Sequence, residues 1–289
     1  DVCVGTGGYV AGPVVIAAAL CGVPTVIKEQ NAYPGLTNRI LARLAHKVAL
    51  GYEAAASRLG PRDKLVVTGN PIRPEIASIA REQGAARLGL DPRRKLVLIT
   101  GASQGARSIN AAVIQAFPRF RRIDAGILVV AGKSGYEALL EALPVRPQEG
   151  RPALGGEGRA FGNVMVVPYL HDMPAALAAA DLVVGRAGAI SIAEVTARGL
   201  PSILIPYPHA AENHQEKNAR VLEEAGAAQV ILDRELDGDA LYEAVTGLLR
   251  DGQRLTAMAE ASRRLGKPDA VWEIVALIEG VVAHGKRRS

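Results

Sequence analysis

The sequence predicts a doubly wound α/β protein in which helices cover both faces of parallel sheets. Short apolar runs alternate with alanine-rich helical patterns along most of the chain. Most of these runs are continuously apolar, which is typical of parallel strands buried on both faces. Gly or Pro marks the turns between them. The expected strands are 2–5, 24–29, 46–50, 64–70, 95–101, 126–132, 163–170, 181–188, 201–208 and 227–232.

A boundary between two units is expected near residues 70–74, where two prolines interrupt the pattern before a new strand begins at Lys95. The strands before this point are few for a complete domain, so we expect a further segment upstream of Asp1. From about Pro268 onward, apolar residues recur at helical spacing, which predicts a final helix. That helix is expected to return to the first unit.

Composition limits the function classes. Of the 289 residues 49% are hydrophobic and 22% charged, enough for a full core and unlike a disordered chain. Aromatic residues make up 4%, which argues against a stacking surface for single-stranded nucleic acid. The formal net charge of +5 suits either an ordinary solvated surface or an anionic partner, such as a phosphate-rich ligand or membrane.

Cysteine usage and hydropathy point to the cytoplasm. Cys3 and Cys21 lie in apolar stretches, where we expect buried free thiols and no disulfide. No apolar stretch reaches membrane-spanning length, and no signal peptide is visible.

The opening GTGGYVAG partly fits a dinucleotide-binding fingerprint. Gly5 and Gly7 match, and Glu29 lies where a ribose ligand would be expected. Val10, however, is a β-branched residue at the third glycine position, where helix and strand must pack closely. A nicotinamide site is therefore disfavoured, and the glycines are also explained by a tight turn.

Two groups of histidine or acidic residues resemble metal sites but are expected to be structural. His209, Glu212 and His214 do not have the spacing that places two histidines on one helical face. Asp237-Gly238-Asp239 follows a strand and opens a helix, which predicts a turn with a helix N-cap. No metal is expected.

The segment GRAGAISIAE places small residues, among them Gly185 and Gly188, between a strand and a helix. Small side chains allow an anionic ligand to approach the N–H groups of a helix N-terminus. Glu194 has two interpretations at this stage. It either closes a capping box with Ser191 or accepts hydrogen bonds from the ribose hydroxyls of a nucleotide.

Several segments together resemble the MurG family of bacterial N-acetylglucosaminyltransferases, which are GT-B enzymes of glycosyltransferase family 28. The resemblance is carried by GTGGYVAGP, KEQNAYPGLTNRILARLA, TGNPIRPE, GASQGARSIN, VVPYLHDMPAALAAADLVVGRAGAISIAEVTARGLPSILIPYPHAAENHQEKNA and the AGAA that follows. It implies two Rossmann-like domains facing across a cleft, the first incomplete, and transfer of N-acetylglucosamine from UDP-N-acetylglucosamine to lipid I. It also implies a peripheral protein at the cytoplasmic face of the membrane, in contact with its anionic surface, with no cofactor and no metal.

The resemblance further implies a domain division and a set of site residues. Residues 1–73, with 268–289, would form the acceptor domain, and residues 74–267 the UDP-sugar domain. Glu194 would bind the ribose, Ser103 the diphosphate, and His214 with Gln215 the sugar. The implied donor-site residues are Asn31, Arg73, Ser103, Leu170, Arg186, Ala189, Ile190, Ser191, Glu194, His214 and Gln215, and the acceptor-site residues are Gly7, Gly8 and Tyr9.

The chain departs from the family pattern at two points. The family's glycine-rich loop with its candidate base histidine has no counterpart after Asp1, so the base is expected upstream. Ala131-Gly132-Lys133 stands where relatives commonly carry a histidine. Two alternatives stay open: another GT-B enzyme, such as a diacylglycerol glucosyltransferase or a UDP-N-acetylglucosamine 2-epimerase, and a UDP-sugar-binding module without catalysis.

Overall fold

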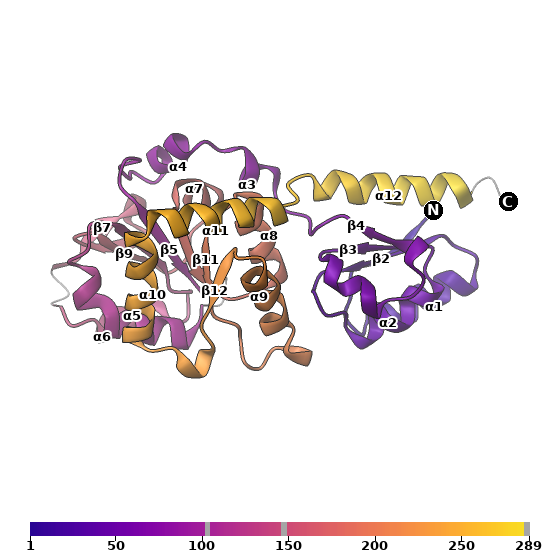
Figure 1. The fold of residues 1–289 in the computed structure, drawn as a ribbon, viewed down its shortest axis with the longest axis horizontal. Coiled ribbons are helices and arrows are strands. Elements are labelled where there is room, and N and C mark those ends of the chain that lie inside the picture. Colours follow the sequence, from indigo (N-terminus) through magenta and orange to yellow (C-terminus); the bar gives the residue numbers. More distant parts are fainter. Residues whose placement is uncertain (102–104, 146–148, 286–289) are drawn as a thin grey trace.

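The structure is a computed structural model that describes residues 1–101, 105–145 and 149–285. Within these residues the chain forms two sheets, each in its own unit (Figure 1). The strand order is β1-β2-β3-β4 in the first sheet and β12-β11-β10-β5-β6-β9-β8-β7 in the second. This arrangement confirms the predicted α/β fold with parallel sheets.

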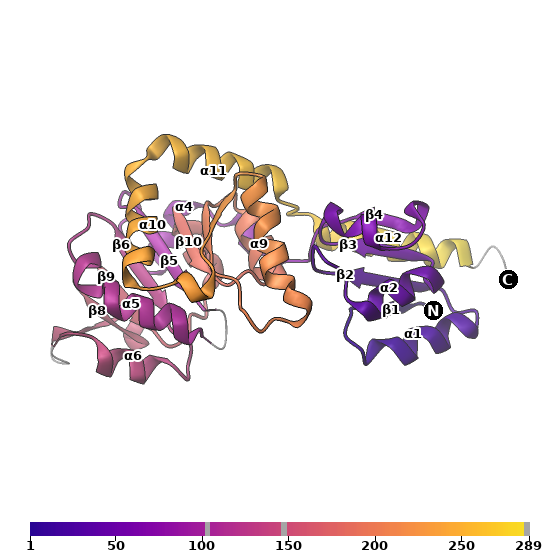
Figure 2. The ribbon, with the colours of Figure 1, turned by 60° about the horizontal axis from the view of Figure 1, so that its bottom comes forward.

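The first unit is a four-stranded parallel sheet with helices on its two faces. Its elements are β1 (Cys3–Gly5), α1 (Ala11–Leu20), β2 (Thr25–Glu29), α2 (Leu36–Leu44), β3 (Lys47–Leu50), η1 (Glu53–Arg58), η2 (Arg62–Lys64) and β4 (Leu65–Val67). Helices α1 and α2 pack on one face, where Val15, Ile27 and Leu41 are fully buried. The last helix, α12 (Ala270–Gly285), lies along β2 and β3 on the other side (Figures 1 and 2).

The second unit is an eight-stranded sheet. Its strands are β5 (Leu96–Thr100), β6 (Gly126–Val130), β7 (Arg151–Ala153), β8 (Gly158–Phe161), β9 (Val164–Val167), β10 (Leu182–Gly185), β11 (Ser202–Leu204) and β12 (Ala228–Val230). Its helices are α3 (Pro74–Ser78), α4 (Arg81–Arg87), α5 (Arg107–Phe120), α6 (Tyr136–Ala142), α7 (Met173–Ala179), α8 (Ala189–Ala197), α9 (His214–Glu224), α10 (Gly238–Arg250) and α11 (Gly252–Leu265), with short 3-10 turns η4 (Leu154–Gly156), η5 (Ala211–Asn213) and η6 (Asp233–Glu235).

The central strand β5 is apolar from Leu96 to Ile99 because helices cover both faces of the sheet. Val97 and Ile99 point into the core cluster beneath α5 and α10. Leu96 and Leu98 point into a second cluster beneath α4 and α7. Because successive side chains of a strand point to opposite faces, a strand covered on both faces has to be apolar throughout.

The structure departs from the sequence-based expectations in two places. Strands β7 and β8 form an antiparallel extension of the sheet, and neither was expected. Their residues include Pro152, Gly158 and Arg159, so they do not form an apolar run. The expectation that both cysteines are buried was also wrong, because Cys3 is half-buried and Cys21, just after α1, is exposed.

The chain crosses between the two units twice, and the crossings touch. Gly69 has φ +77°, and a Cβ added there would lie 2.3 Å from Cβ of Lys267. Only a glycine leaves room for this contact and adopts this backbone conformation without strain. The linker after β4 and the segment before α12 therefore meet side by side.

Candidate functional site

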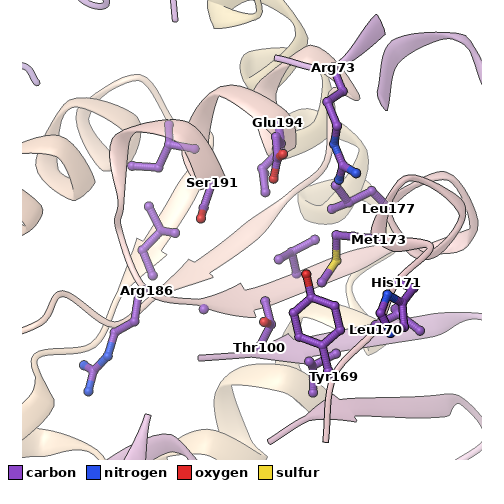
Figure 3. Close-up of a pocket in the computed structure, with 16 residues that line it drawn as sticks. Arg73, Thr100, Tyr169, Leu170, His171, Met173, Leu177, Arg186, Ser191 and Glu194 are labelled. Carbon is purple, nitrogen blue, oxygen red and sulfur yellow. The ribbon is translucent and has the colours of Figure 1, made fainter. Parts of the chain in front are cut away.

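A pocket of about 300 Å³ opens at the carboxyl ends of the strands of the eight-stranded sheet (Figure 3). This is the edge at which ligands bind in doubly wound folds. The side chains come from β5, β6, β9, β10 and β11 or the residues just after them, from α7 and α8, and from the segment before α3. The lining residues are Arg73, Thr100, Val130, Tyr169, Leu170, His171, Met173, Leu177, Val183, Gly185, Arg186, Ser191, Ile192, Glu194, Val195 and Leu204.

Glu194 is the carboxylate of this pocket. Helix α8 begins at Ala189 with Gly188 as its N-cap, and no side chain caps it. The capping-box interpretation is therefore wrong, because Ser191 already lies inside the first turn. The Glu194 side chain points into the pocket toward Arg73 (Figure 3). Burial raises the pKa of the Glu194 carboxyl, and the nearby Arg73 charge opposes that rise.

The opposite wall is apolar and aromatic. Leu170 is only 5% exposed and belongs to the core, yet it also lines the pocket beside Met173 and Leu177. Tyr169 follows β9 and packs edge-on against His171, with ring centroids 4.9 Å apart. A flat heterocycle could pack against this wall while its polar groups face Glu194 and Arg73.

The loop between β10 and α8 brings the backbone close to the pocket. A Cβ on Gly185 would lie 2.9 Å from the carbonyl oxygen of Thr100, and Ala187 is fully buried. The first N–H groups of α8 lack partners within the helix, and the helix dipole makes this end positive. Ser191 adds a hydroxyl at the same end. The loop is thus suited to an anionic group.

A second glycine loop stands at the start of α5. A Cβ on Gly101 would lie 2.2 Å from the backbone nitrogen of Ala106, and Gly105 has φ +75°. The loop therefore requires both glycines for its turn. Ser103, expected at the donor diphosphate, lies outside the described residues.

Arg186 lies in the β10–α8 loop, but its guanidinium points away from Glu194 (Figure 3). It forms an ion pair with Asp233 and donates to Oγ of Ser108 at 2.9 Å. It also donates to the carbonyl oxygens of Ile205 and Pro206. These bonds use the guanidinium to hold neighbouring loops together, and a direct ligand contact stays a prediction.

Four other residues expected at the donor site do not line the pocket. Ala189 is buried, and Ile190 is 39% exposed in the first turn of α8. Gln215 accepts a hydrogen bond from the backbone N–H of Tyr207 at 3.0 Å. His214 contacts the carbonyl oxygen of Ala211 through Nδ1 at 2.8 Å. These contacts fix the start of α9.

Asn31 belongs to the first unit and reaches the second through one side chain. Its Oδ1 accepts a hydrogen bond from Nδ2 of Asn218, on α9, at 3.1 Å. Asn218 was not among the expected site residues, because no local pattern in the sequence marks it. Its role depends on two residues far apart in the sequence.

The residues expected at the acceptor site lie in the turn between β1 and α1. Gly7 has φ +97° and Gly8 has φ +78°, so this turn requires glycine. Tyr9 is 83% exposed. Glu29, the candidate ribose ligand of a dinucleotide site, is instead 2% exposed, and its carboxylate accepts from Asn38 Nδ2 and the N–H groups of Asn31 and Gly35. It anchors the loop after β2.

The Asp237-Gly238-Asp239 pattern forms a helix N-cap. Asp237 caps α10 by accepting from the N–H of Ala240 at 2.7 Å, as predicted. No group of three or more His, Cys, Asp and Glu side chains within the described ranges could hold a metal ion.

Two family models match the chain. The C-terminal domain of glycosyltransferase family 28 matches residues 96–274, and the N-terminal domain of the same family matches residues 1–50.

The similar proteins agree with these matches. The UDP-N-acetylglucosamine–N-acetylmuramyl-(pentapeptide) pyrophosphoryl-undecaprenol N-acetylglucosamine transferase of Moorella thermoacetica is 50% identical over 99% of this chain and 75% of its own length. The crystal structure of MurG from Acinetobacter baumannii has a TM-score of 0.73 and 29% identity, covering 97% of this chain and 73% of that one.

A 2-epimerase fold is also similar. A putative UDP-N-acetylglucosamine 2-epimerase from Listeria monocytogenes has a TM-score of 0.68 at 17% identity, over 98% of this chain and 74% of that one. At that identity the likeness concerns the fold alone. The matched models and the identity to the Moorella protein show that this chain belongs to glycosyltransferase family 28 and, within it, to the MurG family of N-acetylglucosaminyltransferases.

Proposed function

We propose that this chain transfers N-acetylglucosamine from UDP-N-acetylglucosamine to lipid I, forming lipid II in peptidoglycan synthesis. Family membership supports the reaction, since the relatives carry this activity in their names. The observation that carries the proposal is the pocket in which Glu194 and Arg73 face an apolar wall at the start of α8. The carboxylate matches the ribose of a uridine nucleotide, the cation and the helix N-terminus match its phosphates, and the apolar wall matches its base.

In the proposed donor complex the uracil packs against Leu170 near the backbone around Ile190. The carboxylate of Glu194 accepts hydrogen bonds from the ribose hydroxyls. The diphosphate lies at the N-termini of α5 and α8, with Ser103, Ala189 and Ser191 beside it and Arg73 across the pocket. The two positive helix N-termini and the Arg73 guanidinium would stabilise the charge of the departing UDP without a metal.

The sugar is proposed to extend toward the cleft between the units. There Asn31 approaches from the first unit, and His214 and Gln215 from the start of α9. The muramyl O4 of lipid I attacks the anomeric carbon, the bond to UDP breaks, and the configuration inverts. Gly7, Gly8 and Tyr9 are the proposed contacts of the acceptor. We assign no residue of this chain as the general base.

The two units would divide these tasks. We assign residues 1–73 with 268–289 to the acceptor and membrane side, and residues 74–267 to the UDP-sugar. The position of the candidate donor pocket in the second unit supports this division.

The proposed membrane contact lies on α2. No helix in the described ranges is both long and apolar enough to cross a bilayer. A groove of about 530 Å³ between α2 and η1 is lined by Arg39, Arg43 and Arg58, with Leu36 and Ile40 beside them. Arginines beside exposed apolar side chains suit peripheral binding to anionic lipids at the cytoplasmic face.

The test combines binding and turnover. UDP-N-acetylglucosamine binding is measured by calorimetry, and radiolabelled sugar is then supplied with lipid I in vesicles. Lipid II formation with release of UDP is the expected result. Binding without lipid II would favour the UDP-sugar-binding module, and conversion of the sugar nucleotide to its C2 epimer would favour an epimerase. Failure to bind any uridine nucleotide would reject the donor site.

A further inference from the structure

The two units meet through side-chain amides at the edge of the candidate donor site. Asn218, on α9, is fully buried. Its Oδ1 accepts from the backbone N–H of Ala32 at 2.8 Å, and its Nδ2 donates to Oδ1 of Asn31 at 3.1 Å. The same Nδ2 lies 3.3 Å from the carbonyl oxygen of Ala187, in the small-residue loop before α8. One side chain therefore joins the loop after β2 to the loop beside the pocket.

The loop after β2 is already held firmly by its own unit. Glu29 accepts from the backbone N–H of Asn31 at 2.8 Å and from Nδ2 of Asn38 at 2.8 Å. Asn70, in the crossing segment, donates to the carbonyl oxygen of Gln30 at 2.9 Å. With its backbone fixed in this way, the loop leaves the Asn31 side chain as the part that Asn218 orients.

The direction of the hydrogen bond decides what Asn31 can offer. Its Oδ1 accepts from Asn218, and its Nδ2 has no partner among the described residues. An amide in this orientation presents N–H donors, which suit a hydroxyl or carbonyl oxygen of a sugar. Without Asn218 the side chain would be free to turn and would lose this preference.

We propose that Asn218 is a positioning residue for the sugar of the donor. It acts through Asn31, by fixing the orientation of that amide and the approach of its loop to the small-residue loop at Ala187. The inference rests on the proposed function, because it assumes that a UDP-sugar occupies the pocket. It predicts that the nucleotide is recognised within the second unit, whereas recognition of the sugar requires contact between the units.

The variant Asn218→Asp tests the donor function of this side chain at constant size. A carboxylate can still accept from Ala32 N–H, but it cannot donate to Asn31 Oδ1 or to the carbonyl of Ala187. Asn218→Ser is the second variant, which shortens the side chain and retains one O–H donor. Asn31→Asp is the matched control, since it keeps an acceptor for Asn218 while removing the donors offered to the sugar.

The readout is the ratio of the affinities for UDP-N-acetylglucosamine and for UDP, measured by calorimetry on the same preparation. We expect UDP affinity within about twofold of wild type in all variants, which also reports that the second unit is folded. The affinity ratio is expected to fall about tenfold in Asn218→Asp and in Asn31→Asp, and less in Asn218→Ser. The double variant Asn31→Ala/Asn218→Asp should lose no more than Asn31→Ala alone, because the amide that Asn218 orients is then absent.

An unchanged affinity ratio in Asn218→Asp, with normal UDP binding, would overturn the inference and leave the proposed function intact. Additive losses in the double variant would overturn it as well, because Asn218 would then act independently of Asn31. Loss of UDP binding in both Asn218 variants would show a role in the fold instead. If wild-type protein bound neither ligand, the proposed function itself would fail.

Discussion

The two units treat their arginines differently. In the eight-stranded unit, Arg81 pairs with Asp181 at 2.8 Å, and Arg186 is held by Asp233 and Ser108. In the four-stranded unit, the arginines of the α2–η1 groove form no ion pair with a carboxylate within the described residues. Nε of Arg39 is even buried without a hydrogen-bond partner there. The eight-stranded unit thus pairs these arginines with carboxylates, whereas Arg39 and Arg58 of the groove lie over the ring of Tyr33.

Exposed apolar side chains follow the same division. In the four-stranded unit Val10 is 72% exposed and Leu20 82%. Other large apolar side chains on α1 and α2, among them Val14, Leu36 and Ile40, are also more than half exposed. In the eight-stranded unit the exposed examples, Ile190 and Tyr207, lie near the candidate donor site. The two units therefore differ in where large apolar side chains are exposed: on α1 and α2 in the first, and near the candidate donor site in the second.

The largest expected effect comes from breaking the Asp233 network. Asp233→Ala would leave the nearly buried Arg186 without its carboxylate and Ser108 without its acceptor. We expect a loss of about 3 kcal/mol in the free energy of unfolding, measured by denaturant titration, because an unpaired buried charge is costly. The control is Asp91→Ala, whose partner Arg93 is 89% exposed, and no measurable change is expected. Similar stabilities for the two variants would contradict the role given to Arg186.

Replacing Glu194 should separate binding from stability. Glu194→Gln is expected to weaken UDP binding by about 1–3 kcal/mol through lost charged hydrogen bonds. Because burial raises the pKa of Glu194, ionisation of this carboxyl costs the folded state free energy as pH rises above its ordinary pKa. The variant should therefore be no less stable than wild type in thermal unfolding, and UDP should bind wild type more tightly as pH rises through that raised pKa. Unchanged UDP affinity in Glu194→Gln would remove the ribose assignment.

Lys28 tests the interior of the four-stranded unit. It is 4% exposed, and burial lowers its pKa to about 7, with neighbouring Glu29 opposing the shift. Between pH 7 and its unfolded value near 10.5, the unfolded chain binds the proton and the folded chain does not. Stability should therefore rise with pH across this range, by at most about 1.4 kcal/mol per unit. In Lys28→Met the free energy of unfolding should rise less steeply with pH than in the wild type. Equal slopes in the two proteins would contradict a buried, neutral lysine.

The smallest effect is expected at the arginine groove. Arg43→Gln should reduce binding to vesicles containing anionic lipid by about 1 kcal/mol, roughly fivefold, as seen by co-sedimentation. Arg234→Gln, which alters an exposed arginine of the other unit, is the matched control. Vesicles of neutral lipid should show no difference among the three proteins. Equal losses for both variants would mean that net charge, and not the groove, attracts the membrane.

Much of the fold could be predicted because buried parallel strands are continuously apolar. The strand residues from Leu96 to Thr100 need no partner to be recognised. The β7–β8 hairpin could not be found in this way, because an edge pair is covered less and carries Pro152 and Arg159. Only its pairing with β9 makes these residues strands.

The candidate site likewise contains residues that a local sequence pattern marks and residues that no local pattern marks. Glu194 was found because the small residues before it mark a helix start in the local sequence. The actual start at Ala189 excludes the capping box, and the ribose contact of Glu194 stays a prediction. Asn218 and Asp233 were not found, because each acts on a residue distant in sequence and resembles an ordinary surface residue in isolation.

The contact of Gly69 with Lys267 has a mechanical consequence. The two connections between the units lie against each other at this point, so neither can shift without the other. A side chain at position 69 would collide with Lys267 and would have to push the two connections apart.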